Sequence, residues 1–278
     1  MFNYIHWDPN PLIVDFGFVA IRWYSFFFML AIVIGYEWMR RAFQQESLPE
    51  SLFDRLSFWV ILGGILGARL GHCLFYDFAY YSQHPLEIFL PFQWEPEFKI
   101  TGFLGIASHG GAIGIVLVLI FFKYWYKERM PLWTILDHLA LVIPLSGAFI
   151  RLGNLMNSEI IGQGSQLPWA FVFKQVDALP RHPSQLYEAL AYLILFFGIN
   201  AYVRHFQVKA GSGKRFGIFL VAMFVIRFVL EYFKEYQADF ARTWIINMGQ
   251  LLSIPFILGG LIIFIWALRR SVPAPQNQ

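Results

Sequence analysis

Seven apolar stretches, each close to twenty residues long, limit the folds open to this sequence. They cover residues 16–36, 56–76, 103–122, 132–153, 186–203, 216–233 and 251–268. A helix of about 20 apolar residues is long enough to cross the roughly 30 Å hydrocarbon core of a bilayer. We therefore predict an all-α polytopic membrane protein with seven transmembrane helices.

The charge content agrees with a membrane location. Only 14% of the residues are charged and 58% are hydrophobic, with a mean hydropathy of +0.53. Soluble domains carry about 25% charged residues. The net charge of +3 is small and the basic residues are dispersed between the spans, so we expect no nucleic-acid partner.

The distribution of lysine and arginine predicts the orientation. Of the 21 such residues, we place twelve in the odd-numbered connections and the C-terminal tail, five on the opposite side, and four within or at the spans. Cytoplasmic loops carry the excess of positive residues. The N-terminus is therefore predicted outside, in the periplasm, and the C-terminus in the cytoplasm.

The connections suggest how the chain is organised. We expect residues 1–278 to form one integral membrane domain with a disordered Pro/Gln-rich tail at 271–278. The outer connections 77–102 and 154–185 are long and hold prolines, aromatic residues and acids, so we predict a small irregular or β-containing cap. A chain whose elaborate loops lie outside is expected to work on that side.

Four arginines lie within or at the spans, and all four fall in the predicted outer half of the bilayer. They are Arg22, Arg69, Arg151 and Arg227. A charge at such depth is costly and marks a candidate site. Six or seven helices place polar groups in this one layer, which predicts a shared cationic cavity. The polar residues expected there are Tyr24, His109, Gln185, Tyr187, Glu188, Glu231 and Gln250.

A cationic cavity of this kind suits a phosphate, because arginine stays charged and offers a planar fork of donors. The ligand could be an anionic phospholipid head group or an anionic solute. Plainer explanations stay open: arginines that snorkel to the interface, an Arg227–Glu231 pair at i,i+4 spacing, and a Gly110–Gly111 pair that permits close helix packing.

Two other classes of protein compete with an enzyme at this point. A transporter for an anionic solute would carry polar residues through to the cytoplasmic side, whereas 116–122 and 261–268 are apolar. A lipid-binding scaffold would explain the arginines but not His109 and Tyr24 at the same depth. His109, His182 and Glu188 lack a recognisable metal-ligand spacing, so we predict no metal site.

The motifs, taken in order, make this chain similar to a known family. It resembles the prolipoprotein diacylglyceryl transferases, which are bacterial membrane enzymes, over nearly its whole length. Three positions depart from the family pattern: Ile150 replaces glycine, Leu155 replaces phenylalanine and Met223 replaces tyrosine. The motifs are WY at 23–24, GARLG at 67–71, SHGG at 108–111, RLGNLMNSEIIG at 151–162, RHPSQLYE at 181–188, RFVLE at 227–231 and MGQLLSIP at 248–255.

The resemblance implies a reaction. A diacylglyceryl group passes from phosphatidylglycerol to the thiol of the lipobox cysteine in a prolipoprotein signal peptide, which forms a thioether and releases glycerol phosphate. It implies no metal or organic cofactor. It also implies a location in the bacterial cytoplasmic (inner) membrane, among membrane lipids, with the site towards the outer leaflet. We expect a monomer.

The resemblance also assigns roles to residues of this sequence. It implies catalytic roles for Tyr24, His109, Arg151 and Arg227: the two arginines would hold the phosphate leaving group, and His109 is the candidate base for the thiol. Arginine-assisted formation of the thiolate is the alternative to a histidine base. The residues carried over as substrate-binding are Arg69, Arg151, Asn154, Glu159, Gly162, Gln185 and Glu231.

Overall fold

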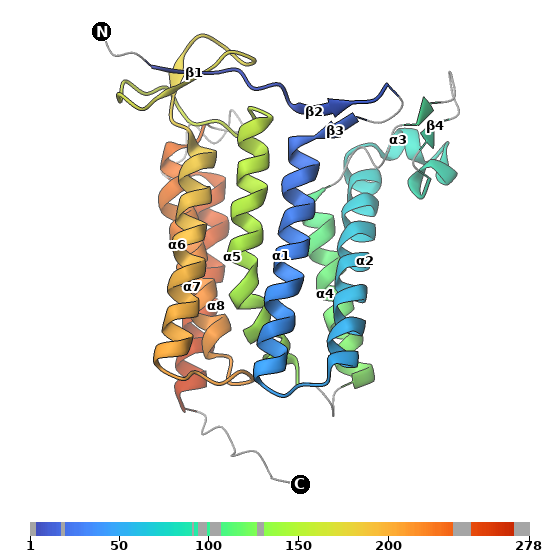
Figure 1. The fold of residues 1–278 in the computed structure, drawn as a ribbon, viewed down its shortest axis with the longest axis vertical. Coiled ribbons are helices and arrows are strands. Elements are labelled where there is room, and N and C mark those ends of the chain that lie inside the picture. The colour runs from blue at the N-terminus through green and yellow to red at the C-terminus, as the bar shows by residue number, and fades with distance from the viewer. Residues whose placement is uncertain are drawn as a thin grey trace. The chain divides into compact units, whose positions relative to one another are not determined.

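The computed structural model describes residues 4–17, 20–90, 92–93, 99–100, 107–126, 131–235 and 246–269. This part of the chain is mostly helical, with small sheets (Figure 1). The predicted disordered tail at 271–278 lies outside it. The long helices are α1 (Trp23–Gln45), α2 (Glu50–Phe75), α4 (Ser108–Tyr126), α5 (Leu132–Met156), α6 (Ser184–His205), α7 (Lys214–Leu230) and α8 (Met248–Arg269).

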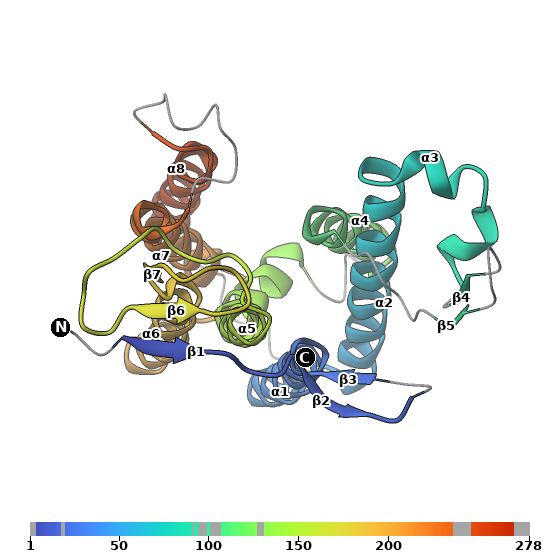
Figure 2. The same ribbon diagram turned by 90° about the horizontal axis from the view of Figure 1, so that it is seen from above.

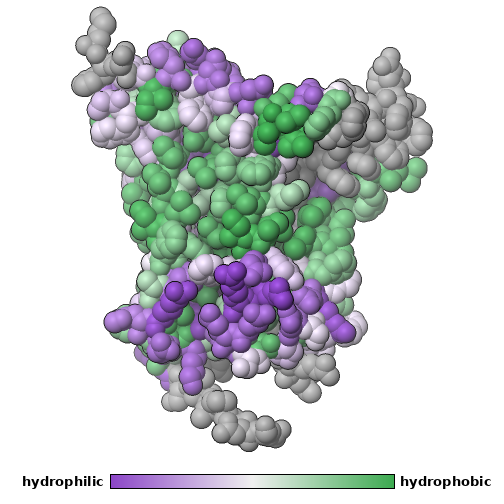
Figure 3. Space-filling view, viewed as in Figure 1, coloured by the Kyte–Doolittle hydropathy of each residue, from purple (hydrophilic) through white to green (hydrophobic). Residues whose placement is uncertain are grey.

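Six of these helices, α2 and α4 to α8, are long and apolar enough to cross a membrane. Each overlaps one of the predicted spans. Their outward faces carry apolar side chains that soluble proteins rarely expose in such numbers, for example Ile194 (73% exposed) and Phe197 (64% exposed) on α6. Figure 3 shows hydrophobic side chains over the middle of α6 and hydrophilic ones towards its ends. The chain is a multi-pass membrane protein.

The first predicted span is placed wrongly. The expected stretch 16–36 begins seven residues before the helix, which runs from Trp23 to Gln45. Arg22 lies instead in β3 (Ala20–Arg22), which pairs antiparallel with β2 (Leu12–Asp15). The last turns of α1 are polar, with Arg41 Nε 2.9 Å from Glu37 Oε1, and α1 is not among the six helices above. Hydropathy alone does not separate a short apolar strand from the helix that follows it.

Contacts divide the chain into two compact units. Unit 1 comprises Met1–Ala42 and Trp133–Gln278, and unit 2 comprises Phe43–Leu132. In unit 1, the Trp38 ring of α1 packs edge-on against Phe196 of α6 at 5.0 Å between centroids, and its Nε1 donates to Asn200 Oδ1 at 3.3 Å. Small residues let α7 and α8 approach closely, since a Cβ added to Gly260 would lie 2.9 Å from the Val221 nitrogen.

A small sheet lies at one end of α5 and α6 in unit 1 (Figures 1 and 2). Strand β6 (Phe171–Phe173) pairs in parallel with β1 (Ile5–Trp7) and antiparallel with β7 (Pro180–Arg181). Trp7 Nε1 donates to the Leu155 carbonyl at 2.9 Å and so fastens the sheet to the end of α5. The expectation that 154–185 contains β-structure is confirmed.

The start of α7 is fixed by a carboxylate from α5. Asp137 is fully buried, and its two oxygens accept hydrogen bonds from the backbone nitrogens of Gly213 and Phe216, each at 2.9 Å. The first N–H groups of a helix have no partner within the helix, and carboxylates suit its positive end. Asp137 thereby sets the position of α7, the helix that carries Arg227.

Unit 2 is built on the crossing of α2 and α4. Gly67 and Gly71 of α2 meet the backbone of Gly110 and Gly114 of α4, with no room for a Cβ between them. This is the close packing that the Gly110–Gly111 pair could permit, and for Gly110 it is confirmed. The other elements of unit 2 are α3 (Phe78–Tyr81), η1 (Pro85–Ile88), β4 (Phe92–Gln93) and β5 (Lys99–Ile100).

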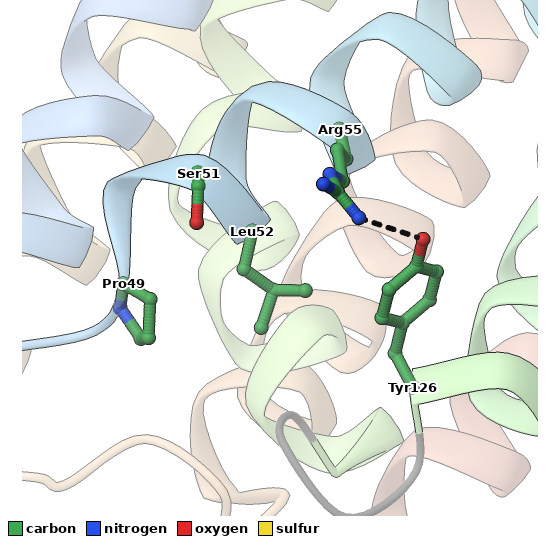
Figure 4. A pocket seen from close by; sticks show the side chains of 5 residues that line it. All are labelled: Pro49, Ser51, Leu52, Arg55 and Tyr126. Carbon is green, nitrogen blue, oxygen red and sulfur yellow. Dashed lines mark hydrogen bonds between the residues drawn. The ribbon is translucent and has the colours of Figure 1, made fainter.

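A cavity of about 370 Å³ lies where α2 begins and α4 ends. Figure 4 shows Arg55 Nη1 donating to the hydroxyl of Tyr126 at 3.4 Å beside it. Pro49, Ser51 and Leu52 complete the lining. Arg55 lies near the start of α2 and Tyr126 at the end of α4, so this contact links the two helix ends.

We expect alanine to have opposite effects at two helical glycines. Gly67→Ala forces a Cβ onto the Gly110 carbonyl, and overpacking of this kind costs roughly 1–3 kcal/mol. Gly198 of α6 has nothing within 4 Å of its Cβ position, and Gly198→Ala should stabilise by about 0.5–1 kcal/mol through helix propensity. Thermal unfolding in detergent, followed by tryptophan fluorescence, measures both. Equal shifts in the two variants would contradict the close crossing of α2 and α4.

Candidate functional site

The centre of the polar cluster in unit 1 is Glu188. Its side chain, on α6, is 0% exposed and lies between two cations. Arg151 Nε of α5 is 2.9 Å from Glu188 Oε2, and Lys234 Nζ is 2.9 Å from Glu188 Oε1. Tyr192, one turn further along α6, donates its hydroxyl to Oε1 at 3.3 Å. Charged groups are almost never buried unless they are paired, and here the pairing is twofold.

Arg151 belongs to a closed circuit of contacts. Its Nη1 donates to Asn154 Oδ1 at 3.0 Å, and Asn154 Nδ2 donates to Glu159 Oε2 at 3.1 Å. Gln185 Nε2 then donates to the Glu159 carbonyl at 2.5 Å. Gln185 lies one turn before Glu188 on α6. Since Glu188 contacts Arg151, the circuit closes. Four predicted site residues are therefore brought together by the end of α5, the segment after it and the start of α6.

The turn after α5 makes this circuit possible. Helix α5 ends at Met156, and Ser158 and Ile160 adopt left-handed backbone conformations with φ of 53° and 55°. This reversal lets the Glu159 nitrogen donate to the Asn154 carbonyl at 2.9 Å. Ser184, at the start of α6, donates its hydroxyl to the Ile160 carbonyl at 2.7 Å.

Gly162 lies where two segments of unit 1 meet. It forms an isolated bridge with Lys234, and its nitrogen donates to the His182 carbonyl at 3.0 Å. A Cβ at this position would collide with His182 and with the Phe233 carbonyl, so only glycine fits without displacement. Gly162 therefore takes part in the site through its backbone, which pairs with the segment that carries Lys234.

Arg227 is half-buried in the last turn of α7, and its side chain has no ion pair or hydrogen bond to another described residue. The i,i+4 pairing with Glu231 does not form. Helix α7 ends at Leu230, Glu231 begins the 3-10 helix η2 (Glu231–Phe233), and its Oε2 lies 3.3 Å from Lys234 Nζ instead. Arg227 is thus a cation without a protein counter-ion in the part of the chain described.

Tyr24 lies in the first turn of α1 and packs against α5. A Cβ added to Gly153 would lie 2.9 Å from Tyr24 Cδ2, so the glycine makes room for the ring. Gly153 is two residues from Arg151. The aromatic side chain is therefore beside the helix turn that carries the site arginine.

The other two predicted site residues, Arg69 and His109, belong to unit 2. Arg69 of α2 is buried, and it donates through Nε to the Ile88 carbonyl at 3.0 Å and through Nη2 to the Glu87 carbonyl at 2.7 Å. Its guanidinium also lies over the Tyr81 ring, 4.8 Å from the centroid. His109 is exposed in the first turn of α4.

A second ion cluster fastens the sheet to the site. Arg181 of β7 contacts Asp177 Oδ2 through Nη2 at 2.6 Å, donates through Nη1 to the Gly162 carbonyl at 3.1 Å, and lies 3.2 Å from Glu235 Oε1. The hydrogen bonds from Arg181 lower the pKa of Asp177, because they favour the ionised carboxylate.

The sequence places Glu188 in the expected cationic cavity but assigns it no catalytic or binding role, and it assigns no site role to Lys234 or Arg181. Glu188 stood within the RHPSQLYE motif, and a carboxylate one turn after Gln185 in an apolar helix was the available signal. The sequence places Lys234 among the basic residues of an outer connection. Only the fold shows that it reaches Glu188, which is 46 positions earlier in the sequence.

These features define a class of protein: a multi-pass membrane protein with a buried cluster of paired charges and, in the last turn of α7, a half-buried arginine. The sequence model of the prolipoprotein diacylglyceryl transferases matches residues 11–266.

Individual relatives match over nearly their whole length. The phosphatidylglycerol–prolipoprotein diacylglyceryl transferase of Bacteroides fragilis is 41% identical over 271 residues, which are 96% of this chain and 97% of the relative. Those of Tolumonas auensis (40% identical; 94% of this chain, 96% of the relative) and Chloroherpeton thalassium (39%; 97% and 96%) are similar. The chain belongs to the prolipoprotein diacylglyceryl transferase family.

The lowered pKa of Asp177 predicts a pH-dependent stability. A carboxylate whose pKa is lower in the folded state stabilises the protein above its unfolded pKa, about 3.9, and this contribution is lost as pH falls through the folded pKa. Asp177→Asn should therefore melt below wild type at pH 7, and the two melting temperatures should converge below about pH 4. Asp8→Asn, at an exposed aspartate, is the control. A difference that does not narrow as pH falls below about 4 would mean that the carboxylate charge is not responsible.

Proposed function

We infer that this chain transfers the diacylglyceryl group of phosphatidylglycerol to the thiol of the lipobox cysteine in prolipoproteins. The products are a thioether-linked prolipoprotein and glycerol phosphate. The observation that carries this inference is the full-length relation to enzymes of that name, at 39–41% identity. The motif at 151–162 also supplies Arg151, Asn154 and Glu159 to one buried circuit.

The reaction makes two electrostatic demands. The cysteine sulfur forms a bond to the glycerol carbon, while the bond between that carbon and the phosphate oxygen breaks and its electron pair leaves with the phosphate. The thiol proton must be removed, since a thiol with pKa near 8.5 is mostly protonated at pH 7. The charge that grows on the leaving oxygen must be held by fixed donors.

Arg151 and Arg227 are the proposed donors to the phosphate. The Nε and Nη1 atoms of Arg151 are occupied by Glu188 and Asn154, which leaves Nη2 without a partner among the described residues. Arg227 has no counter-ion in that part of the chain. A guanidinium that is already oriented by other bonds loses little freedom when the phosphate arrives. Asn154, Glu159 and Gln185 serve by holding Arg151 in place.

We propose His109 as the base that accepts the thiol proton, with Tyr24 lining the site next to Arg151. Thiolate formation in the positive field of the arginines is the alternative to this role. Glu231 contributes by neutralising Lys234. Arg69 binds the carbonyls of Glu87 and Ile88, so its proposed effect on substrate binding acts through the segment that it holds.

For the membrane topology we propose seven spans, with α1 added to the six apolar helices. The N-terminus is then periplasmic, the C-terminus cytoplasmic, and the site faces the outer leaflet of the bacterial cytoplasmic membrane. This orientation follows the twelve-to-five bias of lysine and arginine. The outer-leaflet position gives a monomer access to membrane lipids and to signal peptides on the same side.

The arginine roles predict a large loss of transfer in single variants. Purified protein is mixed with phosphatidylglycerol and a lipobox peptide in detergent, and both glycerol phosphate and the peptide mass are followed. Arg151→Ala and Arg227→Ala should each lose at least about 10²-fold in rate, the cost of removing one fixed donor to a developing oxyanion. Arg204→Ala, at an exposed arginine of α6, and a Cys→Ser peptide are the controls. Near-normal rates in Arg227→Ala would refute its role.

The histidine role predicts a pH-dependent defect. His109→Gln should lower the rate by about 10²-fold at pH 7, because the thiol proton then has no base to accept it. The thiol ionises by itself as pH approaches its own pKa, about 8.5, so the difference from wild type should shrink towards pH 9. If His109→Gln retains most of its activity at pH 7, the thiol is activated by other means.

A further inference from the structure

We propose that Lys234 is a positioning residue for the transfer reaction proposed above: by occupying one oxygen of Glu188, it keeps part of the Arg151 guanidinium available for the phosphate. Lys234 follows η2 and is nearly completely buried, with 4% of its surface exposed. Its Nζ lies between two carboxylates, 2.9 Å from Glu188 Oε1 and 3.3 Å from Glu231 Oε2.

The contact between Arg151 and Glu188 is one-sided. An arginine and a carboxylate prefer to form two parallel bonds, with both oxygens engaged by the guanidinium fork. Here Glu188 Oε1 is taken by Lys234 Nζ and by the Tyr192 hydroxyl, so Arg151 contacts only Oε2, through Nε. Nη1 is turned towards Asn154, and Nη2 is left without a partner among the described residues.

The ammonium of Lys234 is itself fixed by its backbone. Lys234 forms the bridge with Gly162, and backbone bonds on both sides of it hold the same pair of segments together. The Gln163 nitrogen donates to the Phe233 carbonyl at 2.9 Å, and the Glu235 nitrogen donates to the Ile161 carbonyl at 3.2 Å. A lysine side chain is flexible, but one whose main chain and ammonium are both bound has a defined position.

Removal of the Lys234 charge would change which cations pair with Glu188, and so the contacts of Arg151. Glu188 Oε1 would lose its cation, and Arg151 would become the one charged partner of a fully buried carboxylate. The guanidinium would then gain by rotating into the two-bonded arrangement, which brings an Nη group to Glu188. That group would no longer be free for phosphate. Lys234 therefore acts on the lipid through two other residues, without touching it.

The test separates lipid binding from peptide binding. KM for phosphatidylglycerol, as its mole fraction in mixed micelles, and KM for a lipobox peptide are measured in wild type, Lys234→Met and Lys234→Gln. The KM for lipid should rise roughly 10- to 100-fold, by analogy with the loss seen when a residue that orients a metal-ligating side chain is removed. The KM for peptide should stay unchanged. Lys174→Met, at an exposed lysine after β6, is the matched control.

A double variant that removes one positive and one negative charge together tests this mechanism directly. In Lys234→Met with Glu188→Gln, the neutral amide cannot form the two-bonded ion pair with Arg151, so the KM for lipid should return to within about threefold of wild type. Lys234→Arg should also stay near wild type, because it restores a cation between Glu188 and Glu231. Melting temperatures in the same detergent show which variants are folded, and Lys234→Gln substitutes for Lys234→Met if the latter is not.

Three results would overturn the assignment while wild type transfers lipid normally. The first is an unchanged KM for lipid in the folded neutral variants. The second is a double variant no better than the single one. The third is a fall in rate with both KM values unchanged, which indicates a smaller active fraction only. If wild type itself transfers nothing, the proposed function fails, and this outcome is distinct from all three.

Discussion

The buried carboxylate of Glu188 is the interaction on which the site in unit 1 depends. It joins Arg151 of α5 to Lys234 after α7, and it does so from within α6, so three helical segments meet at one charge. Loss of one partner from a buried ion pair typically costs about 3–5 kcal/mol, because the remaining charge stays buried. The Glu188 side chain is 0% exposed, so water does not replace a missing partner. The geometry of the arginine and the packing of the helices are therefore coupled.

Much of this arrangement follows from patterns that are local in the sequence. Long apolar stretches predict α2 and α4 to α8, because a span needs a fixed length of hydrophobic residues. Arginines within such stretches are rare enough to indicate a site, and Arg151 does lie in a buried polar circuit with Asn154, Glu159 and Gln185. The spacing of two residues predicts their contact less reliably than the type of a residue predicts its place in a site. The Glu231 nitrogen does donate to the Arg227 carbonyl, as i,i+4 spacing predicts, but the Glu231 carboxylate pairs with Lys234 instead of Arg227.

The parts that could not be predicted depend on contacts between distant segments. Strand β1 pairs with β6, more than 160 positions away, and nothing within Ile5–Trp7 alone distinguishes a strand from a loop. The start of α1 was placed too early because the apolar strand before it has the same hydropathy as a helix. Lys234 has no local signal at all: a lysine after a span reads as an interface residue, and only the approach of α6 turns it into a buried counter-ion. Family resemblance named Gly162 but could not say that its role is to let the Lys234 backbone approach.

The capping of α7 by Asp137 has a consequence for the way the lipid is handled. Asp137 holds the first turn of this helix through two backbone hydrogen bonds, and the segment that follows its last turn is bridged to Gly162. A helix that is held at both ends cannot slide or rotate about its axis unless the contacts at one end break. Arg227 therefore has a fixed place on a helix held at both ends, and in the reaction proposed above it is the phosphate that moves to the arginine.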